Sequence, residues 1–236
     1  EFRRVLFRSF EIEMSAAQLA LRKSFVPLKV PPFPGAAQRQ APAFERLRSS
    51  GSDALRIGRL VQHGDLKPAD QHYLDRIIRT RGHLSELFQV LLHTPDVADR
   101  MATVGSFFLY ETVLPPALRT LVWLVTAREF DSEYAWQGSV VHARAAGLPD
   151  ALIDALRRGE TPANISGPQA TAIAFCHELM RGNHHVCDTT YNEAVKHFGV
   201  PATIQMAATL GYFAMMSCVA NAFELPPQAD NGRPAL

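Results

Sequence analysis

The sequence has 236 residues, of which 47% are hydrophobic, and its 24 basic and 23 acidic residues leave a net charge of +1. A chain of this size can bury a core of its own, and its length favours one domain or at most two. Because the charges balance, no field of one sign is available to attract nucleic acid or an anionic membrane surface. The three cysteines form no C-x-x-C pair, which favours a reducing, cytoplasmic compartment over a disulfide framework.

The N-terminal part of the sequence offers no chemistry. Residues 1–13 carry arginines among apolar residues but lack the continuous apolar segment of a targeting peptide, so we interpret them as a cloning or sequencing scar. Residues 14–55 are rich in Pro, Ala, Gln and Arg and are expected to form an irregular arm. The domain itself is predicted to span residues 56–227, with a C-terminal tail at 228–236.

Proline and glycine mark the predicted helices of the middle of the chain. Thr94 followed by Pro95 indicates an N-cap and a first helical residue, and Leu114-Pro115-Pro116 precedes a second helix. A third helix is predicted from Ser132 to Ala146, ending at Gly147 in the left-handed conformation, and Pro149 opens the next one.

Four further helices are expected in the C-terminal half. They run near 151–158, near 169–181, from a possible capping box at Thr190 and Glu193 to about Gly199, and from Pro201 onward. No Asp, Glu, Lys or Arg occurs between Lys196 and Glu224, which raises the question of a membrane span. The many small and polar residues there favour close helix packing in a bundle or an oligomer interface instead. We therefore expect no membrane partner, and a homo-oligomer (dimer, trimer or hexamer).

The order of five blocks in residues 56–227 resembles the carboxymuconolactone decarboxylase and alkylhydroperoxidase D-like family. The blocks are FQVLLHTPDVADRM, YETVLPPALRTLVWLVTAREF, EYAWQGSVVHARAAGL, CDTTYNEAVKHFG and GYFAMMSCVANAFELPP. This resemblance implies an all-α, alkylhydroperoxidase D-like bundle whose central helical hairpin carries the active site.

Family members with peroxidase activity use a C-x-x-C-x-x-x-H motif on the second helix of the hairpin and a Glu on the first. By this resemblance the cysteine positions fall at Ser132 and Ala135, the His at Ser139 and the Glu at Thr120. A serine without an adjacent base is a poor nucleophile and alanine is none, so the thiol mechanism is not expected here. No cofactor is expected.

His142 is the best candidate for an acid or base, because it follows the vacated positions on the same helical face. Glu111, before the LPP turn, matches an acidic position common in the family and could orient His142 from the facing helix. Both residues could equally serve packing or helix ends.

The remaining pocket candidates lie around the same hairpin. Tyr134 and Trp136 resemble a Y-x-W element of thiol-free relatives and could wall a small-molecule pocket, although core packing would use them equally well. Ser132, Ser139, Glu133 and Thr120 complete the predicted site, with Glu133 as a possible first-turn cap.

The segment with His184, His185, Cys187 and Asp188 has metal-ligand residue types but not metal-ligand spacing, so we predict a solvated loop rather than a metal site.

The sequence supports two functional hypotheses for the whole domain. One is an acid–base enzyme of the decarboxylase branch acting on a small carboxylated lactone or cyclic acid. The other is a catalytically silent small-molecule-binding or oligomeric scaffold, and alkylhydroperoxidase activity is the least favoured.

Overall fold

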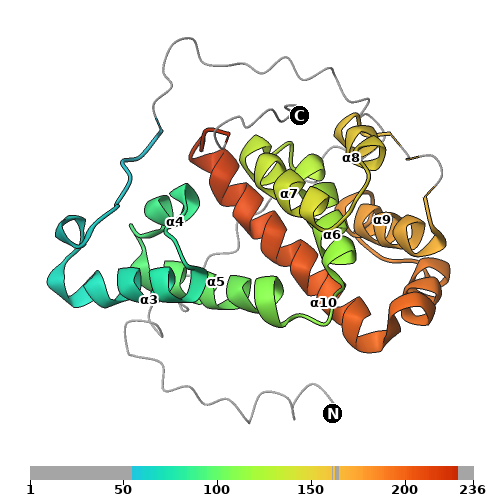
Figure 1. Ribbon diagram of the computed structural model, residues 1–236, viewed down its shortest axis with the longest axis horizontal. Helices are drawn as coiled ribbons and strands as arrows, with labels where there is room; N and C mark the ends of the chain where they lie inside the picture. The colour runs from blue at the N-terminus through green and yellow to red at the C-terminus, as the bar shows by residue number, and fades with distance from the viewer. Residues whose placement is uncertain (1–54, 161, 163–164, 228–236) are drawn as a thin grey trace, which may run out of the picture. The chain divides into compact units, whose positions relative to one another are not determined.

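The computed structural model describes residues 55–160, 162 and 165–227, all within one compact unit, Leu47–Leu236. The predicted scar, most of the predicted arm and the C-terminal tail lie outside the described residues. Helices are the regular structure throughout the described part, which confirms the all-α prediction (Figure 1). Their bounds are α3 (Gln71–Arg81), α4 (Glu86–Leu91), α5 (Pro95–Ser106), α6 (Pro116–Glu129), α7 (Glu133–Ala145), α8 (Asp150–Arg157), α9 (Gly167–Met180) and α10 (Asp188–Ala222).

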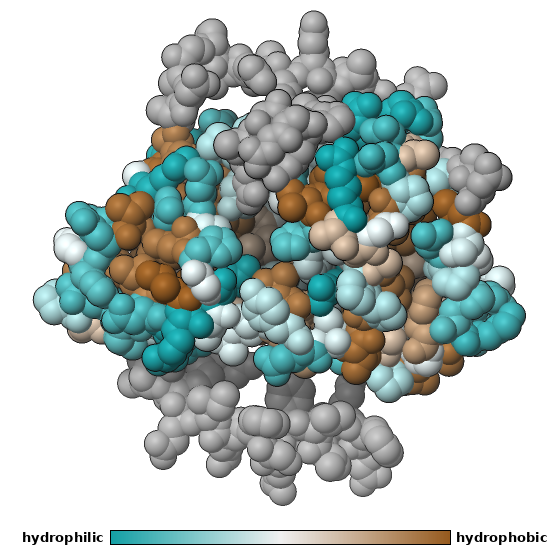
Figure 2. Space-filling view, viewed as in Figure 1, coloured by the Kyte–Doolittle hydropathy of each residue, from teal (hydrophilic) through white to brown (hydrophobic). Residues whose placement is uncertain are grey.

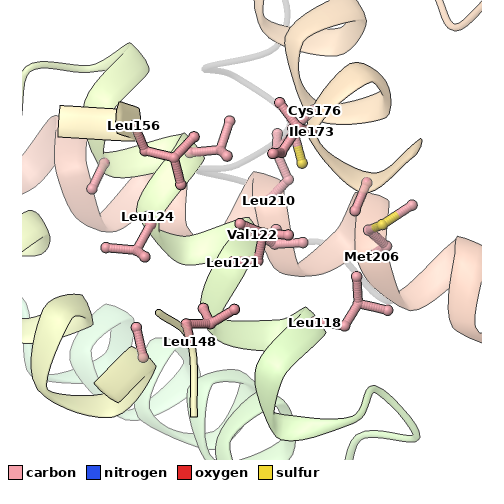
Figure 3. Packing of buried hydrophobic residues seen from close by; sticks show 14 of the residues in the cluster. Leu118, Leu121, Val122, Leu124, Leu148, Leu156, Ile173, Cys176, Met206 and Leu210 are labelled. Carbon is pink, nitrogen blue, oxygen red and sulfur yellow. The ribbon is translucent and has the colours of Figure 1, made fainter. Parts of the chain in front are cut away.

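The hairpin of α6 and α7 lies at the centre of the larger core cluster, with α8, α9 and α10 around it (Figures 1 and 3). Every residue of α6 from Thr120 to Ala127 is buried. Its leucines and valines meet Leu156 of α8, Ile173 of α9 and Met206 of α10. A helix that is apolar on all sides needs neighbours on all sides, and the four packed helices supply them.

A second core cluster joins α3, α4 and α5. Leu74, Ile77 and Phe88 are among its buried residues. Tyr134 of α7 and Ala220 of α10 close it from the other half of the molecule. α10 therefore contributes to both clusters, because Met206 and Leu210 belong to the first.

Most of the proline and glycine residues begin or end helices as predicted. α5 begins at Pro95 and α6 at Pro116, and Gly147 has a φ of 82° directly after α7. The capping box at Thr190 and Glu193 was wrong: α10 already begins at Asp188, and the Thr190 hydroxyl donates to Glu178 instead. The two helices expected around Gly199 run on from each other across a kink, where Gly199 has a φ of 77°.

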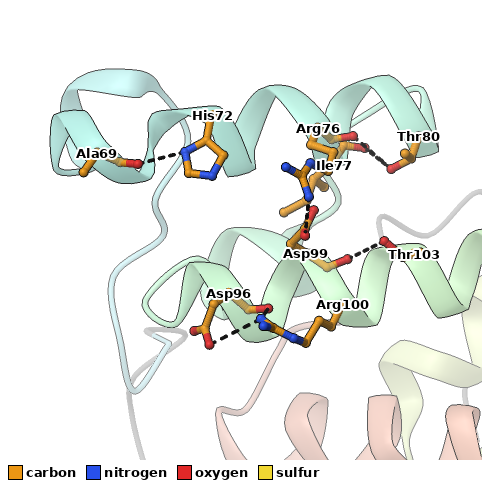
Figure 4. Close-up of polar contacts among 9 residues, drawn as sticks. All are labelled: Ala69, His72, Arg76, Ile77, Thr80, Asp96, Asp99, Arg100 and Thr103. Atoms are coloured by element: carbon orange, nitrogen blue, oxygen red, sulfur yellow. Dashed lines mark hydrogen bonds and ion pairs between the residues drawn. The ribbon is translucent and has the colours of Figure 1, made fainter. Parts of the chain in front are cut away.

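Polar contacts tie α3 to α5 (Figure 4). The Arg76 guanidinium donates to the Asp99 carboxylate at 2.9 Å, and Asp99 is nearly buried. The Thr80 and Thr103 hydroxyls donate to carbonyls one turn earlier in their own helices. Because the Asp99 side chain is buried and would be costly to leave without a partner, this ion pair stabilises the contact between α3 and α5.

The end of the Tyr212 side chain, from α10, lies against α5 at Gly105. A Cβ at this position would overlap the Tyr212 hydroxyl oxygen and would lie 2.6 Å from an Arg81 guanidinium nitrogen. An alanine here would force the Tyr212 ring and the end of Arg81 to shift, and this offsets the penalty that glycine carries in a helix interior.

Gly105→Ala should therefore destabilise the protein by about 1–3 kcal/mol through overpacking, despite the better helix propensity of alanine. Urea unfolding of Gly105→Ala, Tyr212→Phe and the double variant measures the coupling. Removal of the Tyr212 hydroxyl should recover part of the loss. Equal stability of Gly105→Ala and the parent would show that the Tyr212 and Arg81 side chains move away from Gly105 at no cost.

Candidate functional site

The vacated motif positions of α7 face the core rather than a solvent-filled cavity. Ser132 and Ser139 are buried, and the Ser139 hydroxyl donates to the carbonyl of Ala135 at 2.8 Å. On α6 the Thr120 hydroxyl donates to the carbonyl of Pro116 at 2.9 Å. The Ser132 hydroxyl is buried without a hydrogen-bond partner among the described residues. These hydroxyls therefore pack within the hairpin, and no adjacent base among the described residues activates them.

Tyr134 and Trp136 point into different core clusters. Trp136 is fully buried in the first cluster, while Tyr134 lies in the second and its hydroxyl accepts the backbone N–H of Leu87 at 3.3 Å. The pair thus joins the two halves of the core. Glu133 is buried in the first turn of α7, where it accepts a hydrogen bond from Gln137 at 2.8 Å.

His142 lies at the opposite end of α7 from Ser132. Ten residues separate them, which corresponds to about 15 Å along the helix axis. His142 is exposed, and its ring lies nearly perpendicular to that of Trp123 of α6, with the ring centroids 5.5 Å apart. Glu111 is exposed in η4 (Phe107–Glu111), a π-helical turn after α5. That Glu111 orients His142 stays a prediction.

Trp123 is the centre of a mixed aromatic and cationic cluster. Phe213 of α10 stacks on its ring at 4.6 Å, and the guanidinium carbon of Arg119 lies 5.3 Å from the ring centroid. Arg119 precedes Trp123 by one helical turn, so the two side chains share a face of α6. We call Arg119, Trp123, His142 and Phe213 the Trp123 cluster.

Arg119 retains unused hydrogen-bonding capacity. One terminal nitrogen donates to the carbonyl of Leu109 at 2.7 Å. Its Nε and the indole nitrogen of Trp123 are buried donors with no partner among the described residues. Burial lowers the pKa of Arg119, an effect that Tyr110 opposes. A guanidinium is still charged at neutral pH, so the cluster presents a half-buried cation whose charge no described carboxylate balances.

Sequence reasoning missed Arg119. The available signal was an arginine inside the apolar segment LPPALRTLVWLV, four residues before a tryptophan.

Sequence reasoning also missed a charged group at the other end of the hairpin, because the residues of that group come from helices far apart in the sequence. There Glu129 of α6 binds Arg181 and lies 3.5 Å from His177 of α9, beside a shallow crevice.

The histidine-rich loop before α10 is held by local hydrogen bonds. His184 and His185 each place Nδ1 within 3.0 Å of a backbone carbonyl, and the Cys187 backbone N–H donates to Glu178 at 2.7 Å. No group of three or more potential metal-ligating side chains gathers among the described residues. Asp188 is the first residue of α10, as expected from its place near a helix start.

No protein-family model matches the chain, and a search of curated proteins finds no significant match. Solved structures do resemble it. The alkylhydroperoxidase AhpD core, an uncharacterized peroxidase-related protein from Ralstonia eutropha JMP134, has 15% identity and a TM-score of 0.62, over 76% of this chain and 95% of that one. A variant of the debrominase Bmp8, in complex with 2,3,4-tribromopyrrole, has 14% identity and a TM-score of 0.60, over 75% of this chain and 95% of that one.

A third structure is more distant. ATU0492 from Agrobacterium tumefaciens, a protein of unknown function described as a putative antioxidant defence protein AhpD, has 10% identity and a TM-score of 0.51, over 59% of this chain and 96% of that one. Together these likenesses confirm the predicted alkylhydroperoxidase D-like fold. At such low identity they establish the fold and not the activity.

The thiols should differ sharply in reactivity. Burial, and the charge of Glu129 to a lesser degree, raises the pKa of Cys176 to about 12, whereas Cys187 and Cys218 are exposed. In dilute native protein we expect Ellman's reagent to titrate two thiols rapidly and the third only after denaturation. Rapid reaction of Cys176, tested in a Cys187→Ser/Cys218→Ser variant, would contradict its burial.

Stability should fall on mild acidification because of His177. Burial lowers its pKa, the positive charge of Arg181 lowers it further, and Glu129 opposes both. The unfolded state then binds more protons than the folded state below about pH 6.5, so the stability present above that pH is lost as the pH falls toward the folded pKa. Urea unfolding between about pH 7 and about pH 5 should show a smaller loss for His177→Gln than for the parent. A His83→Gln control, changed at an exposed site, should follow the parent.

Proposed function

We propose that the chain is an acid–base enzyme that acts on a small carboxylated lactone or related cyclic acid, without thiol redox chemistry. The observation that carries this proposal is Arg119, a half-buried cation whose charge no described carboxylate balances, placed against the same indole ring as His142. A half-buried guanidinium whose Nε–H has no partner among the described residues is suited to a carboxylate or a developing oxyanion.

The chemistry of decarboxylation fits these two groups. When the bond to the carboxyl carbon breaks, carbon dioxide leaves and the electron pair remains on the substrate as an enolate. Arg119 would stabilise that negative charge. His142, whose side chain is the usual acid–base group near neutral pH, would return a proton to the carbon. Both groups lie within 5.5 Å of the Trp123 ring centroid, so a one-ring substrate could contact both.

The ligand of one structural neighbour agrees in size. Bmp8 was solved with 2,3,4-tribromopyrrole, a single small ring, bound to a protein of this fold. Trp123 is buried and Phe213 already stacks on it, so the half-buried Phe213 is the ring of this cluster against which such a ligand could pack. We carry over the size class of the ligand and not the reaction.

A silent binding or scaffold domain is the second candidate. The packed face of Ser132, Ala135 and Ser139 favours it, because the hairpin has filled the positions at which the family resemblance places reactive groups. Alkylhydroperoxidase activity gains little support, since the raised pKa of Cys176 keeps that thiol protonated.

Binding and turnover can be separated experimentally. The chain has two tryptophans, so Trp123 fluorescence, recorded in a Trp136→Phe background, reports on ligands at the cluster. We expect cyclic carboxylic acids to change it and their neutral esters not to. Arg119→Met should weaken binding at least tenfold, a loss of about 1.4 kcal/mol, whereas Arg79→Met on the exposed face of α3 should not.

His142→Ala should retain binding and lower the decarboxylation rate by roughly 10²–10⁴-fold, measured as carbon dioxide release. Binding without any turnover would favour the silent domain. If Arg119→Met bound acids as the parent does, the Trp123 cluster would not be the site.

A further inference from the structure

The turn between α5 and α6 has an unusual hydrogen-bond pattern. It is π-helical from Phe107 to Glu111, and the Thr112 backbone N–H donates to the Phe107 carbonyl, five residues earlier, at 3.0 Å. Single π-helical turns are rare and frequently occur at functional sites. This turn contacts the Trp123 cluster, because its Leu109 carbonyl accepts a hydrogen bond from the Arg119 guanidinium at 2.7 Å.

The Leu109 carbonyl can accept a side chain because the backbone groups that would otherwise donate to it are used elsewhere. In an α-helix this carbonyl would accept the Val113 N–H, and in a π-helix the Leu114 N–H. Here the Val113 N–H donates to the side-chain oxygen of Gln205 at 2.9 Å. The Leu114 N–H donates to the hydroxyl oxygen of Thr112 at 3.1 Å.

Gln205 of α10 is involved in both of these hydrogen bonds. Its side-chain oxygen accepts the Thr112 hydroxyl at 2.6 Å in addition to the Val113 N–H. A hydroxyl has one proton, so donation to Gln205 leaves the oxygen lone pairs of Thr112 to accept the Leu114 N–H. One amide oxygen therefore directs two backbone N–H groups away from the Leu109 carbonyl.

These hydrogen bonds, rather than apolar burial, fix the end of the turn. Phe108 and Leu114 are buried on either side, but no residue from 109 to 113 is buried, and Tyr110 and Val113 are 67% and 57% exposed. Figure 2 shows apolar side chains at the surface in several separate patches on the face it presents. Such exposed side chains are therefore ordinary on this molecule and require no covering partner. The position of the turn depends on Gln205 instead.

We propose that Gln205 is a positioning residue for Arg119. By keeping the Leu109 carbonyl open, it lets that carbonyl hold the guanidinium against the Trp123 ring. The inference rests on the proposed function only in taking Arg119 as the group that binds the substrate carboxylate. An arginine side chain has several rotatable bonds, so fixing one terminal nitrogen in advance reduces the conformational entropy that ligand binding must overcome.

NMR relaxation of the Arg119 Nε–H in the ligand-free protein tests this inference. The signal is identified by its loss in Arg119→Met. In the parent we expect a rigid Nε–H with a high order parameter. Gln205→Leu lacks the acceptor and Thr112→Val lacks the hydroxyl, so in each variant a backbone N–H should compete for the Leu109 carbonyl. Both variants should therefore lower the order parameter of the Nε–H and shift the indole N–H resonance of Trp123.

Two further variants separate this role from general stability. Thr112→Ser keeps the hydroxyl and should restore the order parameter and the indole shift of the parent. Thr189→Val removes an exposed hydroxyl at the start of α10 and should change neither. If Gln205→Leu proves unstable on thermal unfolding, the comparison of Thr112→Val with Thr112→Ser still decides the outcome.

Ligand affinity gives a second measurement, with benzoate as a one-ring carboxylate probe. Gln205→Leu should weaken benzoate binding roughly three- to tenfold. In an Arg119→Met background it should weaken binding no further, because its effect passes through the guanidinium.

The two measurements distinguish failure of this inference from failure of the proposed function. An Arg119 Nε–H that is as rigid in Gln205→Leu and Thr112→Val as in the parent would overturn the inference, even if the parent binds cyclic acids. A parent that binds no cyclic acid would contradict the proposed function, while the relaxation of the ligand-free protein would still show whether Gln205 positions Arg119.

Discussion

The fold depends on one requirement, the burial of α6 on every side. From Thr120 to Ala127 this helix has no face that water can solvate well, so it is stable only inside a ring of other helices. Its polar side chains meet the same condition internally, because the Thr120 and Thr126 hydroxyls donate to carbonyls one turn earlier. The helices α7, α8, α9 and α10 are arranged so that each packs against α6.

The same requirement decides where chemistry is possible. The hairpin is filled with side chains along α7, from Ser132 at its start to Ser139, which covers the positions where the family resemblance places reactive groups. Polar groups that face solvent are therefore confined to its two ends, with Arg119 and His142 at one and Glu129 and His177 at the other. Because the apolar core is separate from these polar ends, the residues at the ends can change without disturbing the fold.

Sequence reasoning succeeded where local chemistry decides the outcome. Pro95, Pro116 and Gly147 act within a turn of their own positions, so their effects could be predicted. It failed at Thr190, where Glu178 from another helix takes the hydroxyl that a capping box would use. The candidate site was predicted incompletely for the same reason. Residue type identified His142, but its packing beside Arg119, Trp123 and Phe213 depends on tertiary contacts that the sequence of α7 alone does not reveal.

The double role of α10 has a consequence for biosynthesis. The cluster of α3, α4 and α5 is completed by Ala220 and Leu225, more than a hundred residues after Met101. A growing chain on the ribosome must therefore carry Leu74, Ile77 and Phe88 without their final partners until nearly all of the domain has been made. Folding of the first helices should be delayed rather than sequential, and the incomplete chain should be a substrate for chaperones that bind exposed leucine and phenylalanine.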